Sequence, residues 1–215
     1  RTGSVLALGG GVVGDVSGFA ASTYMRGVSL VQVPTTLLAQ VDSAIGGKTG
    51  IDLPSAKNAV GTFYQPKIVV SDMETLTTLP VVDFRNQFAE VIKYGVISDP
   101  SLLELLEEDL GRFLESCSCR RFGIWEFGFL AKVIERSSRA KARVVEEDEH
   151  ETNGKRMILN YGHTFAHALE AASKFRMSHG QAVAIGMIFA GEVACRLGIF
   201  AREAQQRQIK LISKL

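Results

Sequence analysis

Cysteine, net charge and long apolar runs are all scarce in this chain of 215 residues. Three cysteines are too few for the disulfide framework of a small secreted domain, so we expect a reducing compartment, the cytoplasm, with a plastid also compatible. A formal net charge of +1 provides no generic surface for nucleic acid. Glycine-rich and proline-containing stretches interrupt the most apolar region before it reaches the length of a membrane span. The composition therefore predicts neither a nucleic-acid partner nor a membrane.

An initiator methionine is also missing, because the chain begins with Arg1 and passes at once into the apolar run "SVLALGGG". We therefore expect an internal piece of a longer protein, with no leader sequence to interpret. With 46% hydrophobic residues, the chain can bury the core of one large domain or of two small ones.

The two halves of the chain differ in their apolar pattern. Short apolar runs at 4–8, 28–34 and 67–72 are typical of buried strands, and a helix is expected after the first glycine turn. This spacing implies a parallel sheet with a right-handed crossover. Long amphipathic segments come next in the chain, and they indicate helices at 83–97, 101–115, 124–146, 163–175, 179–197 and 201–214. The sequence therefore predicts an α/β half that ends near Pro80 and an all-helical half after it.

The first glycine turn, "LGGGVVGD", places Gly9, Gly11 and Gly14 directly after a strand and at the start of a helix. Glycines there let the backbone and the helix N-terminus approach a phosphate. The alternative is a tight turn that packs the helix on the strand. The next strand lacks the acidic residue that usually holds an adenosine ribose. Asp15 could hold a ribose hydroxyl or cap the helix.

Residues 33–61, "VPTTLLAQVDSAIGGKTGIDLPSAKNAVG", read as a long polar loop. Lysines beside flexible glycines suit an anionic ligand, because each ammonium can approach a phosphate without steric cost. A solvated loop is the alternative, although the apolar approach "LLAQVDSAIGG" favours a binding role. The polar residues of interest are Thr35, Thr36, Asp42, Lys48, Lys57 and Asn58.

The helical half contains a candidate metal site. Glu90 and Lys93 lie three apart in "FAEVIKYG"; they are either a surface ion pair or part of a buried helix, where a carboxylate needs a strong partner such as a metal. If "GKRMILNYGHTFAH" is one continuous helix, its polar groups share one stripe: Arg156, Asn160, His163 and His167. Two histidines and one glutamate form a familiar zinc set with an open position. The protease signature H-E-x-x-H is absent, and His150 is expected on a solvated turn.

Several motifs, in order along residues 3–190, together resemble the 3-dehydroquinate synthase family. They are "GGGVVGDVSGFAASTYMRG", "VQVPTTLLAQVDSAIGGKTGID", "KNAVGTFYQP", "TLTTLP", "FAEVIKYG", "NYGHTFAHALE" and "SHGQAVAIGM". The resemblance implies a Rossmann-like NAD-binding half (1–80) followed by a helical metal- and substrate-binding half (81–215). It also implies conversion of 3-deoxy-D-arabino-heptulosonate 7-phosphate (DAHP) to 3-dehydroquinate and phosphate, by NAD-mediated transient oxidation, phosphate elimination, re-reduction and aldol closure. The metal is usually zinc, with cobalt possible.

The resemblance also implies site residues. The metal positions are Glu90, His163 and His179. The positions that line NAD are Gly10, Gly11, Asp15, Thr35, Thr36, Asp42, Lys57 and Thr78. The positions that contact the substrate are Arg26, Lys48, Asn58, Lys93, Lys141, Arg156, Asn160 and His167. In the family the arginine at the place of Arg26 acts across a dimer interface, so a homodimer is expected.

Departures and rivals accompany this resemblance. The amino-terminal elements that hold the adenosine ribose and a carboxy-terminal lysine of the family have no counterpart here, and one extra residue precedes Arg156. Other sugar phosphate cyclases share the fold, but their substrates lack the carboxylate that a cationic cluster would hold. Iron-type alcohol and glycerol dehydrogenases would release reduced cofactor. A catalytically silent domain of a larger chain remains the alternative from a different class.

Overall fold

The computed structural model describes residues 3–53, 56–117, 122–174 and 176–215, without the side chains of residues 56–58. Its first part contains β1 (Ser4–Gly9), α1 (Gly11–Thr23), η1 (Tyr24–Arg26), β2 (Ser29–Pro34), η2 (Ala39–Ser43), β3 (Lys48–Leu53), β4 (Ala56–Phe63), β5 (Ile68–Val69) and η3 (Met73–Thr78). Its second part contains α2 (Val81–Ile97), α3 (Pro100–Ser116), α4 (Ile124–Glu147), η5 (Lys155–Asn160), α5 (His163–Ala172), α6 (His179–Arg196) and α7 (Arg202–Ile212). Every described element after residue 80 is helical, as expected.

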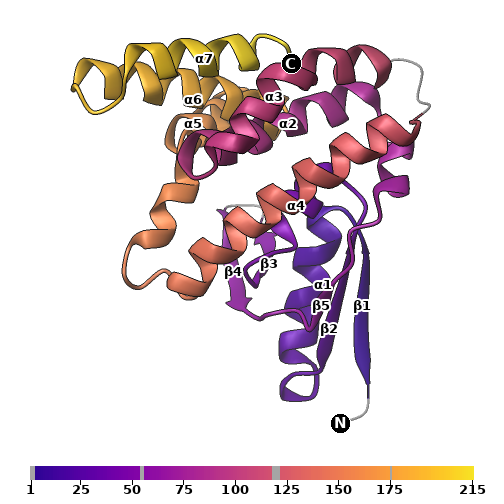
Figure 1. Ribbon diagram of the computed structural model, residues 1–215. Helices are drawn as coiled ribbons and strands as arrows, with labels where there is room; N and C mark the ends of the chain where they lie inside the picture. The colour runs from indigo at the N-terminus through magenta and orange to yellow at the C-terminus, as the bar shows by residue number, and fades with distance from the viewer. Residues whose placement is uncertain (1–2, 54–55, 118–121, 175) are drawn as a thin grey trace.

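A parallel sheet of order β1-β2-β5 forms the base of the molecule (Figure 1). β1 pairs with β2 along its whole length, whereas β5 contributes two residues. Helix α1 approaches β2 at Gly14 and β3 at Gly18, two glycines that allow close contact. A Cβ added at Gly14 would lie 2.8 Å from Gln32 Oε1, and one at Gly18 would overlap the Thr49 side chain. The three predicted strands and their parallel pairing are confirmed, and Gly14 has the packing role that was the alternative to phosphate binding.

The prediction of a long polar loop at 33–61 is wrong. β3 (Lys48–Leu53) and β4 (Ala56–Phe63) pair as the antiparallel strands of a hairpin, with an irregular register between Ile51 and Leu53. The strands are hard to recognise because glycines interrupt them. Gly50 and Gly61 face each other where a side chain would collide with the backbone of the opposite strand. The glycines that suggest a loop in the sequence are therefore required by the close pairing of the two strands. Before the hairpin, η2 is a single π-helical turn.

The main core lies among the helices, where aromatic rings pack together. Phe84, Phe88, Phe113 and Phe129 are buried, and the rings of Phe113 and Phe129 lie 4.6 Å apart between centroids. Helix α4 runs diagonally between the sheet part and the other helices (Figure 1). The Ser138 hydroxyl on α4 donates to the Gln40 carbonyl of η2, at 3.1 Å. None of the described helices is long and apolar enough to cross a membrane.

The condition for one shared stripe, a single helix from Arg156 to His167, is not met, whereas the helix predicted to begin at residue 163 is confirmed. The 3-10 turn η5 ends at Asn160, and α5 begins at His163 after Gly162, whose φ is +79°. A left-handed residue cannot continue an α-helix, so the stripe of polar groups is divided between two elements. The predicted new helix at "RMSHG" is confirmed. Ser178 caps it by accepting from the Gln181 amide, and His179 is its first residue.

Helices α5 and α6 meet at two glycines. A Cβ added at Gly186 on α6 would overlap the carbonyl oxygen of Gly162 and lie 3.2 Å from the amide nitrogen of Ala166. The two backbones are therefore in direct contact close to the point where α5 begins. Any side chain there must separate the helices that begin with His163 and His179.

Gly186→Ala tests this contact. We expect it to lower the free energy of unfolding by about 1–3 kcal/mol, because an extra methyl group has no space between the backbones. Gly128→Ala is the control, since a Cβ at this exposed position of α4 meets nothing within 4 Å. The control should stabilise by about 0.5–1 kcal/mol through the helix preference for alanine. Urea unfolding of both variants measures the difference, and equal effects would contradict the contact.

Candidate functional site

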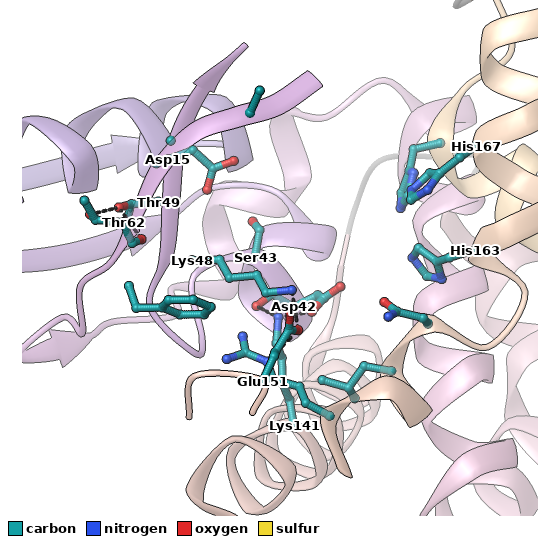
Figure 2. Close-up of a pocket in the computed structure, with 18 of the residues that line it drawn as sticks. Asp15, Asp42, Ser43, Lys48, Thr49, Thr62, Lys141, Glu151, His163 and His167 are labelled. Atoms are coloured by element: carbon teal, nitrogen blue, oxygen red, sulfur yellow. Dashed lines mark hydrogen bonds and ion pairs between the residues drawn. The ribbon is translucent and has the colours of Figure 1, made fainter. Parts of the chain in front are cut away.

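A cavity of about 570 Å³ lies between the hairpin, η2, the α4–η5 segment and the first turns of α5 and α6 (Figure 2). Both halves of the chain contribute to its wall. The predicted site residues in that wall are Asp15, Asp42, Lys48, Lys93, Lys141, Arg156, Asn160, His163, His167 and His179. The structure thus brings together groups that are far apart in the sequence.

The three predicted metal ligands converge. Glu90 Oε1 lies 3.3 Å from His163 Nε2 and 3.3 Å from His179 Nε2. One ligand atom from each residue lies within 4.8 Å of the other two. Glu90 is fully buried on α2, whereas the side chains of His163 and His179 are 13% and 32% exposed. The cluster is thus closed on the glutamate side and accessible on the histidine side.

The outer nitrogens of both imidazoles are held by acceptors. His163 Nδ1 lies 3.2 Å from the Tyr161 carbonyl oxygen, and His179 Nδ1 lies 3.2 Å from Glu170 Oε1. A neutral imidazole that donates from Nδ1 has its lone pair on Nε2. Two such lone pairs then face Glu90 Oε1, which is buried and has no hydrogen-bond partner within the described part of the chain. Three acceptors directed at one point fit a cation.

Glu90 is ionised in this arrangement. Burial alone would raise its pKa, but the charge of the Lys93 ammonium holds the pKa of Glu90 well below its usual range. Lys93 contacts the other carboxylate oxygen, Oε2, and leaves Oε1 to the histidines. Lys93 therefore neutralises the carboxylate without occupying the space between the three ligands.

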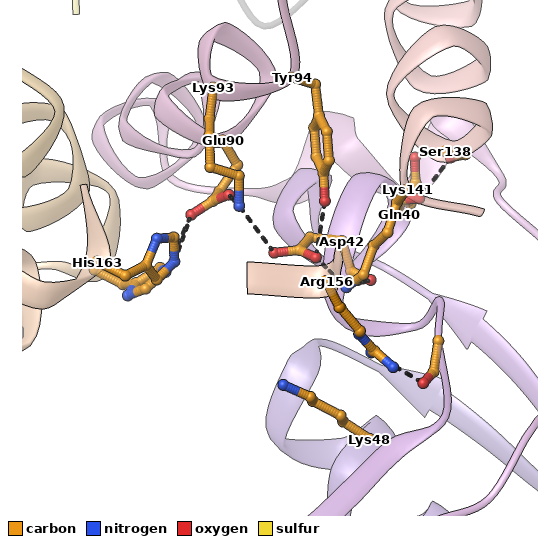
Figure 3. Close-up of polar contacts among 12 residues, drawn as sticks. Gln40, Asp42, Lys48, Glu90, Lys93, Tyr94, Ser138, Lys141, Arg156 and His163 are labelled. Atoms are coloured by element: carbon orange, nitrogen blue, oxygen red, sulfur yellow. Dashed lines mark hydrogen bonds and ion pairs between the residues drawn. The ribbon is translucent and has the colours of Figure 1, made fainter. Parts of the chain in front are cut away.

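A second buried charge network surrounds Asp42 on the π-turn (Figure 3). Its carboxylate contacts the Lys141 ammonium directly, accepts from the Tyr94 hydroxyl at 3.0 Å, and lies 4.0 Å from Lys93 Nζ. Burial lowers the pKa of Lys141 despite its pairing with Asp42. For Asp42, the attraction of Lys141 and Lys93 outweighs burial and lowers the pKa. Asp42 thus links the sheet part to α2 and α4.

Lys48 and Arg156 both line the cavity and share one carboxylate. Glu151 Oε1 lies 2.5 Å from Lys48 Nζ and 3.5 Å from Arg156 Nε. Arg156 is almost fully buried, and its guanidinium also donates to the carbonyls of Gly46 and Glu149, at 3.0 and 2.8 Å. Sequence reasoning missed Glu151, which it left in a solvated acidic run; His150 beside it is indeed exposed on a turn.

Four of the candidate dinucleotide residues, Gly10, Gly11, Thr35 and Thr36, directly follow the carboxyl ends of β1 and β2. Gly10 precedes the first residue of α1, and no side chain caps that helix end, so its amides are available to a phosphate. A Cβ at Gly10 would lie 3.1 Å from Thr36 Cγ2, which keeps this turn close to the segment after β2. Asp15 does not cap the helix; it lines the cavity. Burial raises the pKa of Asp15 to about 6, although Lys141 opposes the shift.

Other predicted residues lie outside this wall. Thr78 is exposed at the end of η3 and donates to the Thr75 carbonyl at 2.8 Å. Thr35, just after β2, donates its amide to the Gly9 carbonyl at 2.9 Å. Arg26 is exposed in the turn between α1 and β2, with φ +64°, and does not line the cavity of its own chain. The side chains of Lys57 and Asn58 lie outside the described residues.

Comparison with known families covers the whole chain. The family profile described as 3-dehydroquinate synthase N-terminal matches residues 1–86, and the profile described as 3-dehydroquinate synthase C-terminal matches residues 87–215. The chain belongs to the 3-dehydroquinate synthase family. The family predicted from the motifs is therefore confirmed.

Curated 3-dehydroquinate synthases are similar over the full chain. The protein of a Synechococcus species is 52% identical over 215 residues, which are 100% of this chain and 56% of that protein. The protein of Microcystis aeruginosa is 50% identical over 215 residues, or 57% of its length. The chain thus spans slightly more than half the length of these 3-dehydroquinate synthases.

Solved structures of sugar phosphate cyclases share the fold. One is a 2-epi-5-epi-valiolone synthase from Streptomyces hygroscopicus with NAD⁺ and Zn²⁺ bound. Its TM-score is 0.88 at 30% sequence identity, and the match covers 100% of this chain and 58% of the synthase chain. A 2-deoxy-scyllo-inosose synthase complexed with carbaglucose-6-phosphate, NAD⁺ and Co²⁺ has a TM-score of 0.81 at 34% identity, covering 99% and 56%. The predicted α/β fold class is confirmed.

Proposed function

We propose that the protein containing this chain is a 3-dehydroquinate synthase, which converts DAHP to 3-dehydroquinate and phosphate with NAD and a divalent metal. The observation behind this proposal is the convergence of Glu90, His163 and His179 on one point at the wall of a cavity rich in cationic side chains. A centre for a cation beside groups for anions suits a phosphorylated sugar acid. The division into an NAD-binding part (1–80) and a metal- and substrate-binding part (81–215) belongs to the same proposal.

The donor set favours zinc, with cobalt as a substitute. Two imidazole nitrogens and one carboxylate are a common zinc set that leaves a coordination position for a substrate oxygen. When bound, the metal supplies Lewis acidity toward that oxygen, and NAD accepts and returns a hydride. This chain's own contribution is to hold both in one cavity. Lys93 neutralises Glu90 from the side away from the imidazoles.

The remaining polar residues would bind the substrate and the cofactor. Anionic groups of the substrate are assigned to Lys48, Asn58, Lys93, Lys141, Arg156, Asn160 and His167, with Arg26 supplied by the second subunit of a homodimer. NAD is assigned to the glycine turn and the strand ends, with Gly10, Gly11, Asp15, Thr35, Thr36, Asp42, Lys57 and Thr78. Glu151 occupies the space between Lys48 and Arg156, so a substrate anion that binds both must displace this carboxylate.

The second candidate function is that of another sugar phosphate cyclase, because this chain is 30% and 34% identical to two solved structures of such enzymes. The identity of about 50% to curated 3-dehydroquinate synthases favours the first candidate. So does the cationic wall, because a substrate with a carboxylate as well as a phosphate makes use of more positive groups.

Phosphate release tests the proposal. The protein in its full natural length is assayed with DAHP, and in parallel with glucose 6-phosphate, which has no carboxylate. We expect release from DAHP to require NAD and to fall to background after chelation, because hydride transfer needs both groups. Readdition of zinc should restore it. Release that persists without NAD and without metal would exclude this mechanism, and preference for glucose 6-phosphate would favour the second candidate.

A further inference from the structure

We propose that Glu170 is a positioning residue for the metal site: its carboxylate accepts the Nδ1 proton of His179 and thereby directs the Nε2 lone pair at the cation. This inference rests on the proposed metal site and extends it by one residue. Glu170 is not one of the residues that line the cavity, and it reaches the site through its contact with His179.

The burial of Glu170 supports this role. Its side chain is 6% exposed, and a carboxylate so far from solvent needs a donor. His179 Nδ1 lies 3.2 Å from Glu170 Oε1, while His179 Nε2 lies 3.3 Å from Glu90 Oε1. The imidazole thus stands between two carboxylates, and each ring nitrogen faces one of them. A proton can occupy Nδ1 in that arrangement while Nε2 remains free for a metal.

The two histidines differ in how their outer nitrogens are held. For His163 the acceptor is the backbone carbonyl of Tyr161, only two residues away. For His179 the acceptor is a side chain from a different helix, because Glu170 lies near the end of α5 and His179 begins α6. The Glu170–His179 hydrogen bond therefore fixes both the tautomer of one ligand and its placement relative to the helix of the other ligand. A substitution can remove it without altering the backbone.

Metal affinity separates this role from a structural one. The full-length protein, freed of metal, is titrated with Zn²⁺ against a chromogenic chelator, and with Co²⁺ while its visible absorption is recorded. Glu170→Ala should weaken zinc binding by about 10–100-fold, the usual loss when an outer hydrogen-bond partner of a ligand is removed. Its Co²⁺ spectrum should change, because the orientation of one ligand is released. Glu170→Gln should lie between the wild type and Glu170→Ala, since the amide oxygen still accepts but has no charge.

The control is Asp99→Asn, which makes the same carboxylate-to-amide change in a structural pair. Asp99 accepts from Arg136 Nε at 2.9 Å and caps α3 at the Leu102 amide, away from the cavity. It should lower stability and leave zinc affinity unchanged. If Glu170→Gln and Glu170→Ala both fold and keep the zinc affinity and Co²⁺ spectrum of the wild type, the inference is overturned. If only Glu170→Gln folds, wild-type zinc affinity in that variant overturns it. Failure of the wild type to bind zinc would instead count against the proposed function.

Discussion

His179→Ala should abolish stoichiometric metal binding while the protein stays folded. The change removes one of three converging ligands, and we expect affinity to fall by more than the roughly 100-fold that loss of an outer partner costs. It also leaves Glu170 buried without its donor, at a cost of about 1–3 kcal/mol in the free energy of unfolding. Metal content after dialysis measures the first effect, and urea unfolding measures the second.

His150→Ala is the matched control, because it removes the same ring from an exposed turn. His150 contacts the Phe63 ring, with centroids 5.3 Å apart, and is not one of the three converging ligands. Metal content in this variant should equal that of the wild type. If His179→Ala retained wild-type metal content, the assignment of the ligand set would be wrong.

Asp42→Asn should destabilise the protein by about 3 kcal/mol, the lower end of the cost of breaking a buried ion pair. The lower end applies because the Asp42 side chain is still 19% exposed. The variant removes the negative charge between Lys141 and Lys93, so the two ammonium groups keep their burial and lose a shared counter-charge. Urea unfolding of the wild type and the variant in one buffer measures the loss.

Glu135→Gln gives the comparison for an exposed pair. Glu135 and Arg139 form an ion pair on the surface of α4, with exposed side-chain fractions of 63% and 62%. Solvent screens such a pair, so its loss should cost about 0.3–0.5 kcal/mol. An Asp42→Asn effect no larger than that of Glu135→Gln would show that the network around Asp42 does not stabilise the fold.

The metal site was predictable because its residues stand out chemically. Glu90 lies in an apolar helix where a carboxylate needs a partner, and three of the four histidines of the chain cluster within twenty residues. Their convergence could not be calculated from spacing, because His163 and His179 begin two different helices. The resemblance to a family supplied that step, and the structure brings the same three residues together.

Glu170 and Glu151 were missed for different reasons. Glu170 lies three positions after His167 in the same predicted helix, and this spacing gives no sign of a partner nine residues later in another helix. Glu151 lies in an acidic run that reads as solvated surface. Its position depends on the turn that Asp148 stabilises, by accepting from the amides of Thr152 and Arg156, and such a turn has no periodic signal.

The π-helical turn at Ala39–Ser43 makes the length of that segment critical. An α-helix has about 3.6 residues per turn, and the wider π-turn accommodates an additional residue in the same stretch. Replacement of the π-turn by ordinary α-helix would change the directions of the side chains within it, because successive side chains are about 100° apart in an α-helix and the wider turn separates them by a smaller angle. The Asp42 carboxylate would then turn away from Lys141, Lys93 and Tyr94 although every one of those residues was still present.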